Sequence, residues 1–189
     1  MKNFTDLIKA CKEGDEKSQR ELYHRMKARW MGICVRYVKD GDESKDVFQE
    51  ATLKIFNDLD KLKEPDAFES WARRIIINAS LNYIKQQKAY LFTLDASAMH
   101  RGEDIDRSDE QVILKLDQEH LINLINTIPE GYRRVLNLSI IDGFSHSEIA
   151  EMLNINESTS RSQLSKAKRY LKDILESFKK LPHEKAVGQ

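Results

Sequence analysis

The chain has 189 residues, of which 40% are hydrophobic and 33% are charged, and its 31 basic residues are balanced by 31 acidic ones. This composition excludes an extended disordered chain, and the length suits one medium domain or two small ones. Glycine and proline are scarce, and β-branched residues nowhere alternate with polar ones, so we predict an all-α fold.

Charge is distributed in blocks, although the formal net charge is zero. Residues 20–39 and 71–88 are basic, residues 41–70 and 101–119 are acidic, and the last predicted helix is basic again. Such alternation indicates several surfaces with different partners. The alternative for any single block is an ordinary solvated helix face.

The residues that bind metals or carry out catalysis do not cluster in this sequence. Cys11 and Cys34 lie among apolar neighbours without a Cys-x-x-Cys motif, and the five histidines are scattered. We therefore expect buried free thiols, no metal, no cofactor and no catalytic residues. Because neither a signal peptide nor a run of about 18 apolar residues is present, we expect a cytoplasmic protein.

Apolar residues at three-to-four spacing predict four helices in the first half of the chain. The breaks between them are marked by Gly14, Gly41 and Pro65. In the fourth helix we expect an inner face made of Phe68, Trp71, Ala72, Ile75 and Ala79. The predicted ranges of the four helices are 4–12, 17–38, 44–62 and 67–88.

One outer face of the fourth helix carries amide and basic side chains in a stripe. Arg74, Asn78, Asn82 and Lys85 follow one another at helical spacing. Amides can read base edges and cations can hold phosphates, so the stripe suits single-stranded nucleic acid, with plain solvated surface as the alternative.

The pattern of apolar residues changes after residue 88. Residues 89–110 are polar and acidic without clear periodicity, so we interpret them as a linker. Helical periodicity returns at residues 111–128 and stops at Pro129, which we expect near the start of a helix that ends at Gly143 in a left-handed cap. We predict these domains: a first domain at 1–88, a linker at 89–111, a second domain at 112–178 and a tail at 179–189.

Residues 143–175 have the pattern of a helix-turn-helix. Ser145 and Glu148 form a capping box, Asn154 fits a left-handed helix end, and Asn156 can cap the second helix. In the second helix we expect an inward face made of Leu164, Ala167, Leu171, Ile174 and Phe178.

The other face of that second helix is polar and basic. The first turns of such a helix enter the major groove, where Arg or Lys pairs with guanine and Ser donates to bases or phosphates. A basic surface helix that closes a small bundle is the alternative. The outward residues are Ser158, Ser162, Ser165, Lys166 and Arg169, with Arg161 on the flank.

Taken in order, these motifs resemble an extracytoplasmic-function (ECF) sigma factor of bacterial RNA polymerase. The resemblance covers about residues 5–88 and 112–175. It departs from the family pattern at Asn82 and Lys85, where Asp and Arg are usual, at Ser160, where an apolar core residue is usual, and at Asn156 and Ser158. The matching motifs are Gly14-Asp15, Leu22-Tyr23, Asp46 with Gln49-Glu50, Phe68 with Trp71, Asn78, Ile128-Pro129 and Thr159 with Ser162.

This resemblance implies a non-enzymatic sigma factor that binds core RNA polymerase, recognises −10 and −35 promoter elements and assists DNA melting. The implied partners are the β′ clamp helices, the β flap tip, promoter DNA and an anti-sigma factor. The implied −35 contacts are Ser158, Thr159, Arg161, Ser162, Ser165, Lys166 and Arg169. The implied −10 contacts are Lys61, Lys63, Phe68, Arg73, Arg74, Asn78, Asn82 and Lys85. The implied core polymerase contacts are Asp46, Gln49, Glu50 and Leu53.

Three other readings remain open at this point. A helix-turn-helix regulator of another class would bind duplex DNA as a dimer and would protect symmetric half-sites. A hydrolase or nuclease would use the acid-rich segment 41–70, although its acids lack a paired constellation. A diverged sigma-like protein would bind an anti-sigma partner but no promoter.

Overall fold

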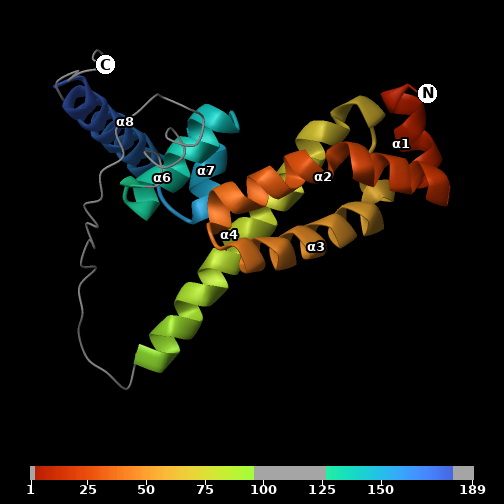
Figure 1. Ribbon diagram of the computed structural model, residues 1–189, viewed down its shortest axis with the longest axis horizontal. Helices are drawn as coiled ribbons and strands as arrows, with labels where there is room; N and C mark the ends of the chain where they lie inside the picture. The colour runs from red at the N-terminus through yellow and green to blue at the C-terminus, as the bar shows by residue number, and fades with distance from the viewer. Residues whose placement is uncertain (1–2, 96–126, 181–189) are drawn as a thin grey trace, which may run out of the picture. The chain divides into compact units, whose positions relative to one another are not determined.

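The computed structural model describes residues 3–95 and 127–180, with side chains described over 3–88 and 127–176 (Figure 1). Over these ranges the secondary structure is entirely helical, which confirms the predicted all-α fold. The chain divides into two compact units, residues 1–103 and 104–189, and each is described by itself. The predicted helix at 111–126 and the tail from 181 lie outside the described residues.

The first unit contains four α-helices and two short 3-10 turns. Each of the first three α-helices begins at a side-chain cap: Asn3, Asp15 and Asp40 accept hydrogen bonds from the backbone N–H groups that follow them. The helices predicted at 4–12 and 17–38 are confirmed. The elements are α1 (Phe4–Lys12), α2 (Glu16–Val38), α3 (Gly41–Asn57), η1 (Leu59–Lys61), η2 (Pro65–Ala67) and α4 (Phe68–Asp95).

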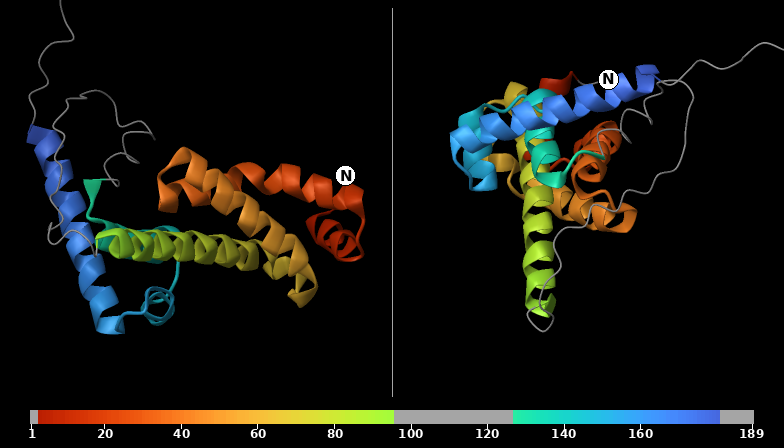
Figure 2. Two further views of the ribbon diagram at one scale, coloured as in Figure 1. Left: turned by 90° about the horizontal axis from the view of Figure 1, so that it is seen from below. Right: turned by 90° about the vertical axis from the view of Figure 1, so that its left-hand side faces the viewer.

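Helices α2, α3 and α4 pack against one another in pairs, and α1 packs on α2 (Figures 1 and 2). Trp30 and Phe68 are the largest fully buried side chains, and their ring centroids lie 6.2 Å apart. Burying apolar side chains of this size is the main source of stability for a small unit.

Several predicted helix boundaries in this unit are wrong. Helix α3 spans Gly41–Asn57 rather than 44–62, because the chain passes into the short turn η1 at Leu59. The break expected at Gly41 falls at Lys39, which has a φ of 69°, and Asp40 then caps α3 by accepting from the N–H groups of Asp42 and Glu43. Helix α4 ends at Asp95 rather than Lys88, because no glycine or proline interrupts residues 89–95.

The predicted inner face of α4 needs a related correction. Of the predicted residues, Phe68 and Ala72 are buried, whereas Trp71, Ile75 and Ala79 are only half-buried. Ile76, Ile77 and Ser80 are buried although they were not predicted to be. Because α4 packs against both α2 and α3, its buried face is wider than the single stripe that periodicity suggested.

The second unit contains α6 (Glu130–Leu136), the π-helix η3 (Asn137–Ile141), α7 (His146–Leu153) and α8 (Glu157–Lys180). Pro129 is the N-cap of α6, one position before the helix. The single helix expected up to Gly143 gives way to a π-turn, in which Asp142 N–H donates to Asn137 O at 2.9 Å. Gly143 takes the expected left-handed conformation, with a φ of 77°.

The predicted helix-turn-helix is confirmed in its local geometry. Ser145 and Glu148 form a reciprocal capping box at the start of α7, and Asn154 ends that helix in the left-handed region, with a φ of 53°. Ile149, Leu164 and Ala167 are buried where α7, α8 and α6 pack together.

Candidate nucleic-acid interfaces

Helix α8 presents a polar and basic face to solvent. Its inward residues Leu164 and Ala167 are buried, Leu171 and Ile174 are half-buried, and the side chain of Phe178 lies outside the described residues. Thr159 is half-buried. The predicted reading residues that the structure exposes are Ser158, Arg161, Ser162, Ser165, Lys166 and Arg169.

Two of the basic side chains on this face have partners within the unit. Arg161 forms an ion pair with Glu157, one turn earlier in α8. Lys166 Nζ lies 5.6 Å from the centroid of the Tyr132 ring on α6, a cation–π distance. These contacts restrict the orientation of both long side chains.

A partly buried hydrogen bond connects the first turns of α7 and α8. Ser160 has no exposed surface, and its Oγ lies 2.8 Å from His146 Nδ1. The departure from the family pattern at Ser160 therefore falls on a core position, as the resemblance implied, and His146 supplies the partner that a buried hydroxyl requires.

The stripe on α4 is exposed as predicted. Arg74, Asn78, Asn82 and Lys85 all face solvent, while Arg73 is half-buried beside them. The stripe therefore offers amide and cationic groups along one side of a rigid helix.

The segment between α3 and α4 brings Lys61 and Lys63 to the surface near the start of α4. It is held in place by α1: Lys12 Nζ donates to Leu62 O at 2.7 Å, and Thr5 Oγ1 donates to Asp66 Oδ1 at 2.7 Å. Lys61 pairs with Asp58 at 2.5 Å. These contacts give the segment a defined shape.

Phe68 does not belong to the candidate −10 surface. Its side chain is fully buried, and its ring contacts Phe4, Trp30 and Trp71 at centroid distances of 5.8, 6.2 and 6.1 Å. Phe68 therefore anchors the start of α4 in the core and positions the preceding segment.

Helix α3 exposes a polar face around one apolar side chain. Asp46, Gln49 and Glu50 are exposed, and Leu53 on the same helix is 65% exposed. An apolar residue ringed by polar ones is typical of a protein-binding surface.

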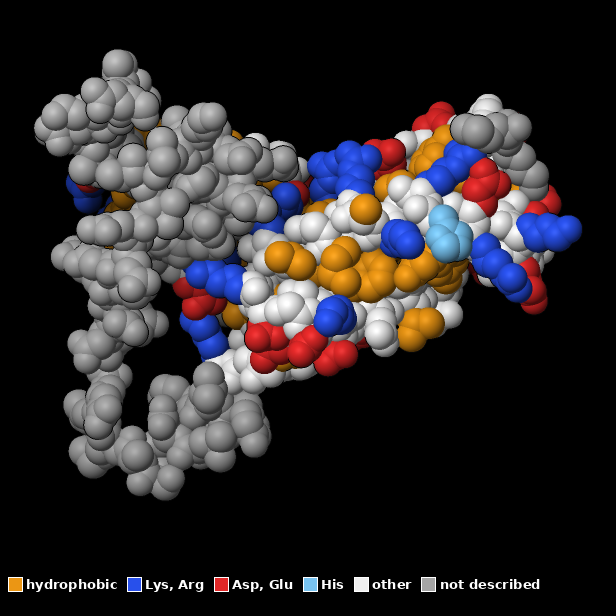
Figure 3. All heavy atoms as spheres, in the orientation of Figure 1, with side chains coloured by type: hydrophobic (Ala, Val, Ile, Leu, Met, Phe, Trp, Pro, Cys, Tyr) orange, Lys and Arg blue, Asp and Glu red, His pale blue; other side chains and the backbone are white. Residues whose placement is uncertain are grey.

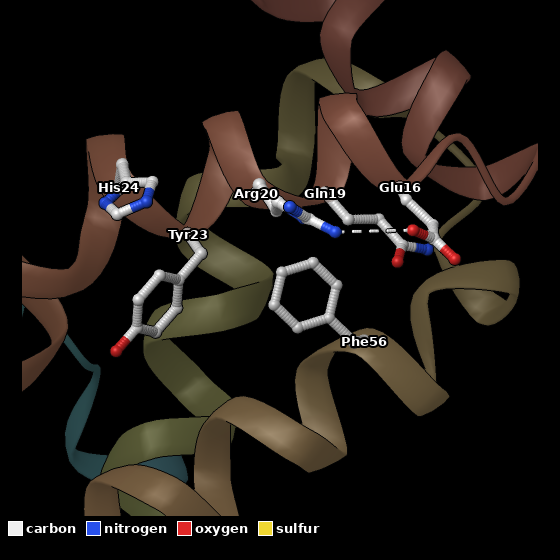
Figure 4. Close-up of a pocket in the computed structure, with 6 residues that line it drawn as sticks. All are labelled: Glu16, Gln19, Arg20, Tyr23, His24 and Phe56. Atoms are coloured by element: carbon white, nitrogen blue, oxygen red, sulfur yellow. Dashed lines mark hydrogen bonds and ion pairs between the residues drawn. The ribbon is translucent and has the colours of Figure 1, made fainter.

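An open hollow of about 390 Å³ lies between α2 and α3 (Figure 4). The rings of Tyr23 and Phe56 line it, and Arg20 pairs with Glu16 at its edge at 3.5 Å. Figure 3 shows apolar side chains exposed along the seam between these two helices, with charged side chains on both sides.

The described residues include no group of three or more metal-binding side chains. Similarly, none of the helices over the described ranges is long and apolar enough to cross a membrane.

Family models match both units of this chain. A model described as Sigma-70 region 2 matches residues 22–90, and one described as Sigma-70, region 4 matches residues 118–171. Together the two matches cover more than half of the chain. The chain belongs to the sigma-70 family. It is a sigma factor that acts in promoter-specific transcription initiation, with core RNA polymerase and promoter DNA as its partners.

Two similar proteins are both ECF RNA polymerase sigma-E factors. The one from Haemophilus influenzae is 24% identical over 178 residues, which span 90% of this chain and 94% of that protein. The one from Escherichia coli strain K12 is 27% identical over 170 residues, which span 86% and 88%. The ECF resemblance inferred from the sequence motifs of this sigma factor is thereby confirmed.

Two solved structures share the fold of this sigma factor, each at 18% identity. One is CnrH in complex with the cytosolic domain of CnrY, with a TM-score of 0.53 over 92% of this chain and 97% of that one. The other is the sigma factor RpoE of Bartonella quintana in complex with the anti-sigma factor NepR, with a TM-score of 0.54 over 83% and 96%.

Sequence reasoning missed several residues that shape these surfaces. Tyr132 and His146 were not singled out, because their partners Lys166 and Ser160 lie far along the chain. The π-turn that exposes Ile140 and Ile141 was also missed. No local pattern distinguishes a π-turn from ordinary helix, whereas Ser160 at an apolar position was a signal that a polar partner was needed.

Proposed function

We propose that this sigma factor reads a −35 element with α8 and a −10 element with the α4 stripe and the segment before it. The observation that carries the proposal is the exposed face of α8. Six of the seven predicted −35 residues are exposed on it, while Leu164 and Ala167 fix the opposite face in the core. A helix-turn-helix presents such a face to the major groove.

At the −35 element, Arg161 would pair with guanine O6 and N7 and specify sequence. Ser158, Ser162 and Ser165 would donate to base edges or phosphates, and Lys166 would hold a phosphate. Arg161 would leave Glu157 to make this contact. Because guanine presents a distinct pair of acceptors, the proposal predicts that Arg161 sets a preference for one base and does not simply raise affinity for every DNA sequence.

At the −10 element, Asn78 and Asn82 would read the edges of an unstacked base, and Arg74 and Lys85 would hold its backbone. Lys61, Lys63 and Arg73 would add phosphate contacts from the adjoining segment. The proposal is supported by the exposure of the stripe and by the bonds from α1 that hold the segment in place.

Core polymerase would bind the α3 face made of Asp46, Gln49, Glu50 and Leu53, with β′ clamp helices as the partner. The β flap tip would take an apolar surface on the second unit, for which Ile140 and Ile141 are candidates, at 57% and 42% exposure. Apolar side chains exposed this far favour a protein partner.

The role we propose is non-enzymatic and cytoplasmic, since the protein acts by placing the polymerase on DNA. An anti-sigma factor is a further proposed partner, on the likeness to the Bartonella quintana sigma factor, which was solved with one. That partner would compete with core polymerase or DNA for the surfaces above.

The test is run-off transcription with core polymerase and pooled genomic promoter fragments. We expect new start sites with the wild-type protein and their loss with Arg161→Ala/Lys166→Ala. The control Lys9→Ala/Lys172→Ala also removes two exposed charges and should retain activity. Absence of both transcripts and core polymerase binding would overturn the proposal, and protection of symmetric half-sites without polymerase would favour a dimeric regulator.

A further inference from the structure

The first turn of α8 carries the side chains proposed to read the −35 element, and one residue of that turn points inward. Ser160 lies between Thr159 and Arg161 and is fully buried. Its hydroxyl meets His146 Nδ1 at 2.8 Å, and His146 is the first residue of α7. The bond therefore joins the start of one helix to the start of the next.

This bond constrains a motion that apolar packing resists only weakly. Leu164 and Ala167 hold α8 against its neighbours, but burial of apolar surface is non-directional and tolerates small rotations. A hydrogen bond is directional, and it weakens steeply when its angle changes. Since successive residues lie about 100° apart around a helix, rotation of this turn would displace Ser158, Arg161 and Ser162 together.

We propose that His146 is a positioning residue for −35 recognition, acting through Ser160 to hold the first turn of α8 in its reading orientation. This inference rests on the proposed role of α8 in reading DNA. Packing and supporting hydrogen bonds together hold contact residues within about 0.5 Å of a productive geometry. His146 supplies such support from a neighbouring helix.

Substitutions of His146 and Ser160 distinguish the effect of the hydrogen bond from the effect of the aromatic ring. His146→Phe keeps an aromatic ring but leaves a fully buried hydroxyl unpaired, so the turn must shift or admit water. His146→Asn places an amide group close to the position of Nδ1 and can keep the bond. Ser160→Ala removes the hydroxyl, and it should be milder than His146→Phe because the side chain that then loses its partner, His146, is only half-buried.

The experiment measures transcription by the reconstituted holoenzyme from two templates that differ only at the −35 element. One template carries a promoter selected from random DNA by the wild-type holoenzyme, and the other carries the same promoter with its −35 element scrambled. The ratio of transcripts does not depend on the fraction of protein that is folded. We expect His146→Phe to lower this ratio about threefold to tenfold and His146→Asn to keep it within about twofold.

Two results would overturn the inference while leaving the proposed function intact. In the first, the wild-type ratio is high, and His146→Phe reduces total transcription from both templates but leaves the ratio unchanged. That result would indicate a purely structural role. In the second, His146→Asn loses as much of the ratio as His146→Phe. A wild-type ratio near one would instead show that α8 does not read the −35 element. The proposed function of α8 and the inference about His146 would then both fail.

Discussion

Lys166 on α8 lies over the ring of Tyr132 on α6, with Nζ 5.6 Å from the ring centroid. The contact joins a residue proposed to bind DNA to a helix outside the helix-turn-helix. It holds an exposed, four-carbon side chain close to one orientation. An ammonium group over an aromatic face is stabilised by about 0.5–1 kcal/mol at exposed sites.

Lys166→Ala should weaken promoter binding by a similar factor for every −35 sequence. A lysine bound to phosphate contributes charge rather than sequence readout, so the slope of log affinity against log salt should fall by about 1. Tyr132→Leu should give a smaller loss of affinity, and Tyr132→Phe should match the wild type because it keeps the ring. The measurement is holoenzyme binding to promoter DNA over a salt series. An effect of Lys166→Ala confined to one base pair would contradict the phosphate assignment.

Leu53→Glu should reduce affinity for core RNA polymerase by about tenfold or more. Leu53 is the apolar residue of the α3 face and is 65% exposed, and a charge placed in a protein interface is desolvated without a partner. Fluorescence anisotropy with labelled sigma factor and core polymerase gives the affinity. The control is Val35→Glu, which also adds an acid to an exposed apolar site but on α2. Equal losses in the two variants would argue against a specific α3 interface.

Phe68→Ala should destabilise the first unit by about 3–5 kcal/mol, since it leaves a cavity among Phe4, Trp30 and Trp71. Phe68→Leu should cost less and should open promoters as the wild type does. Urea unfolding followed by tryptophan fluorescence measures the stability, and permanganate footprinting measures promoter opening. If Phe68→Leu is folded but fails at the −10 element, Phe68 contacts DNA after all.

Raising the pH above 9 should destabilise the first unit through Cys34. Burial raises the pKa of this thiol from 9.0 to about 11. The folded state therefore holds the proton more tightly than the unfolded chain. The stabilisation is complete below pH 9 and is lost as the pH rises toward 11.

Urea unfolding at pH 8 and pH 10 measures this loss, with Cys34→Ala as the reference because it keeps every other titrating group. The wild type should lose more stability than Cys34→Ala over this interval. An equal loss in both proteins would place the effect elsewhere. Alkylation of Cys34 at pH 8 should likewise be slow until the protein unfolds.

The local sequence alone determined most of the secondary structure and two cap geometries. The capping box at Ser145 and Glu148 and the left-handed Asn154 depend on side chains that meet their own backbone within a few residues. The exposed stripe on α4 and the outer face of α8 also follow from helical periodicity, which fixes the residues that share a face. Such features need no knowledge of distant residues.

The tertiary structure decided which face each helix buries and which residues meet across the chain. Periodicity predicted Ile75 and Ala79 on the inner face of α4, whereas packing against α2 and α3 buries Ile76 and Ile77. Thr5 meets Asp66 and Lys12 meets Leu62 only because α1 folds back on the segment before α4. The bond between His146 and Ser160 likewise depends on how α7 turns into α8. A sequence fixes the chemistry of each group, whereas distances between groups far apart in sequence are set by how the helices pack.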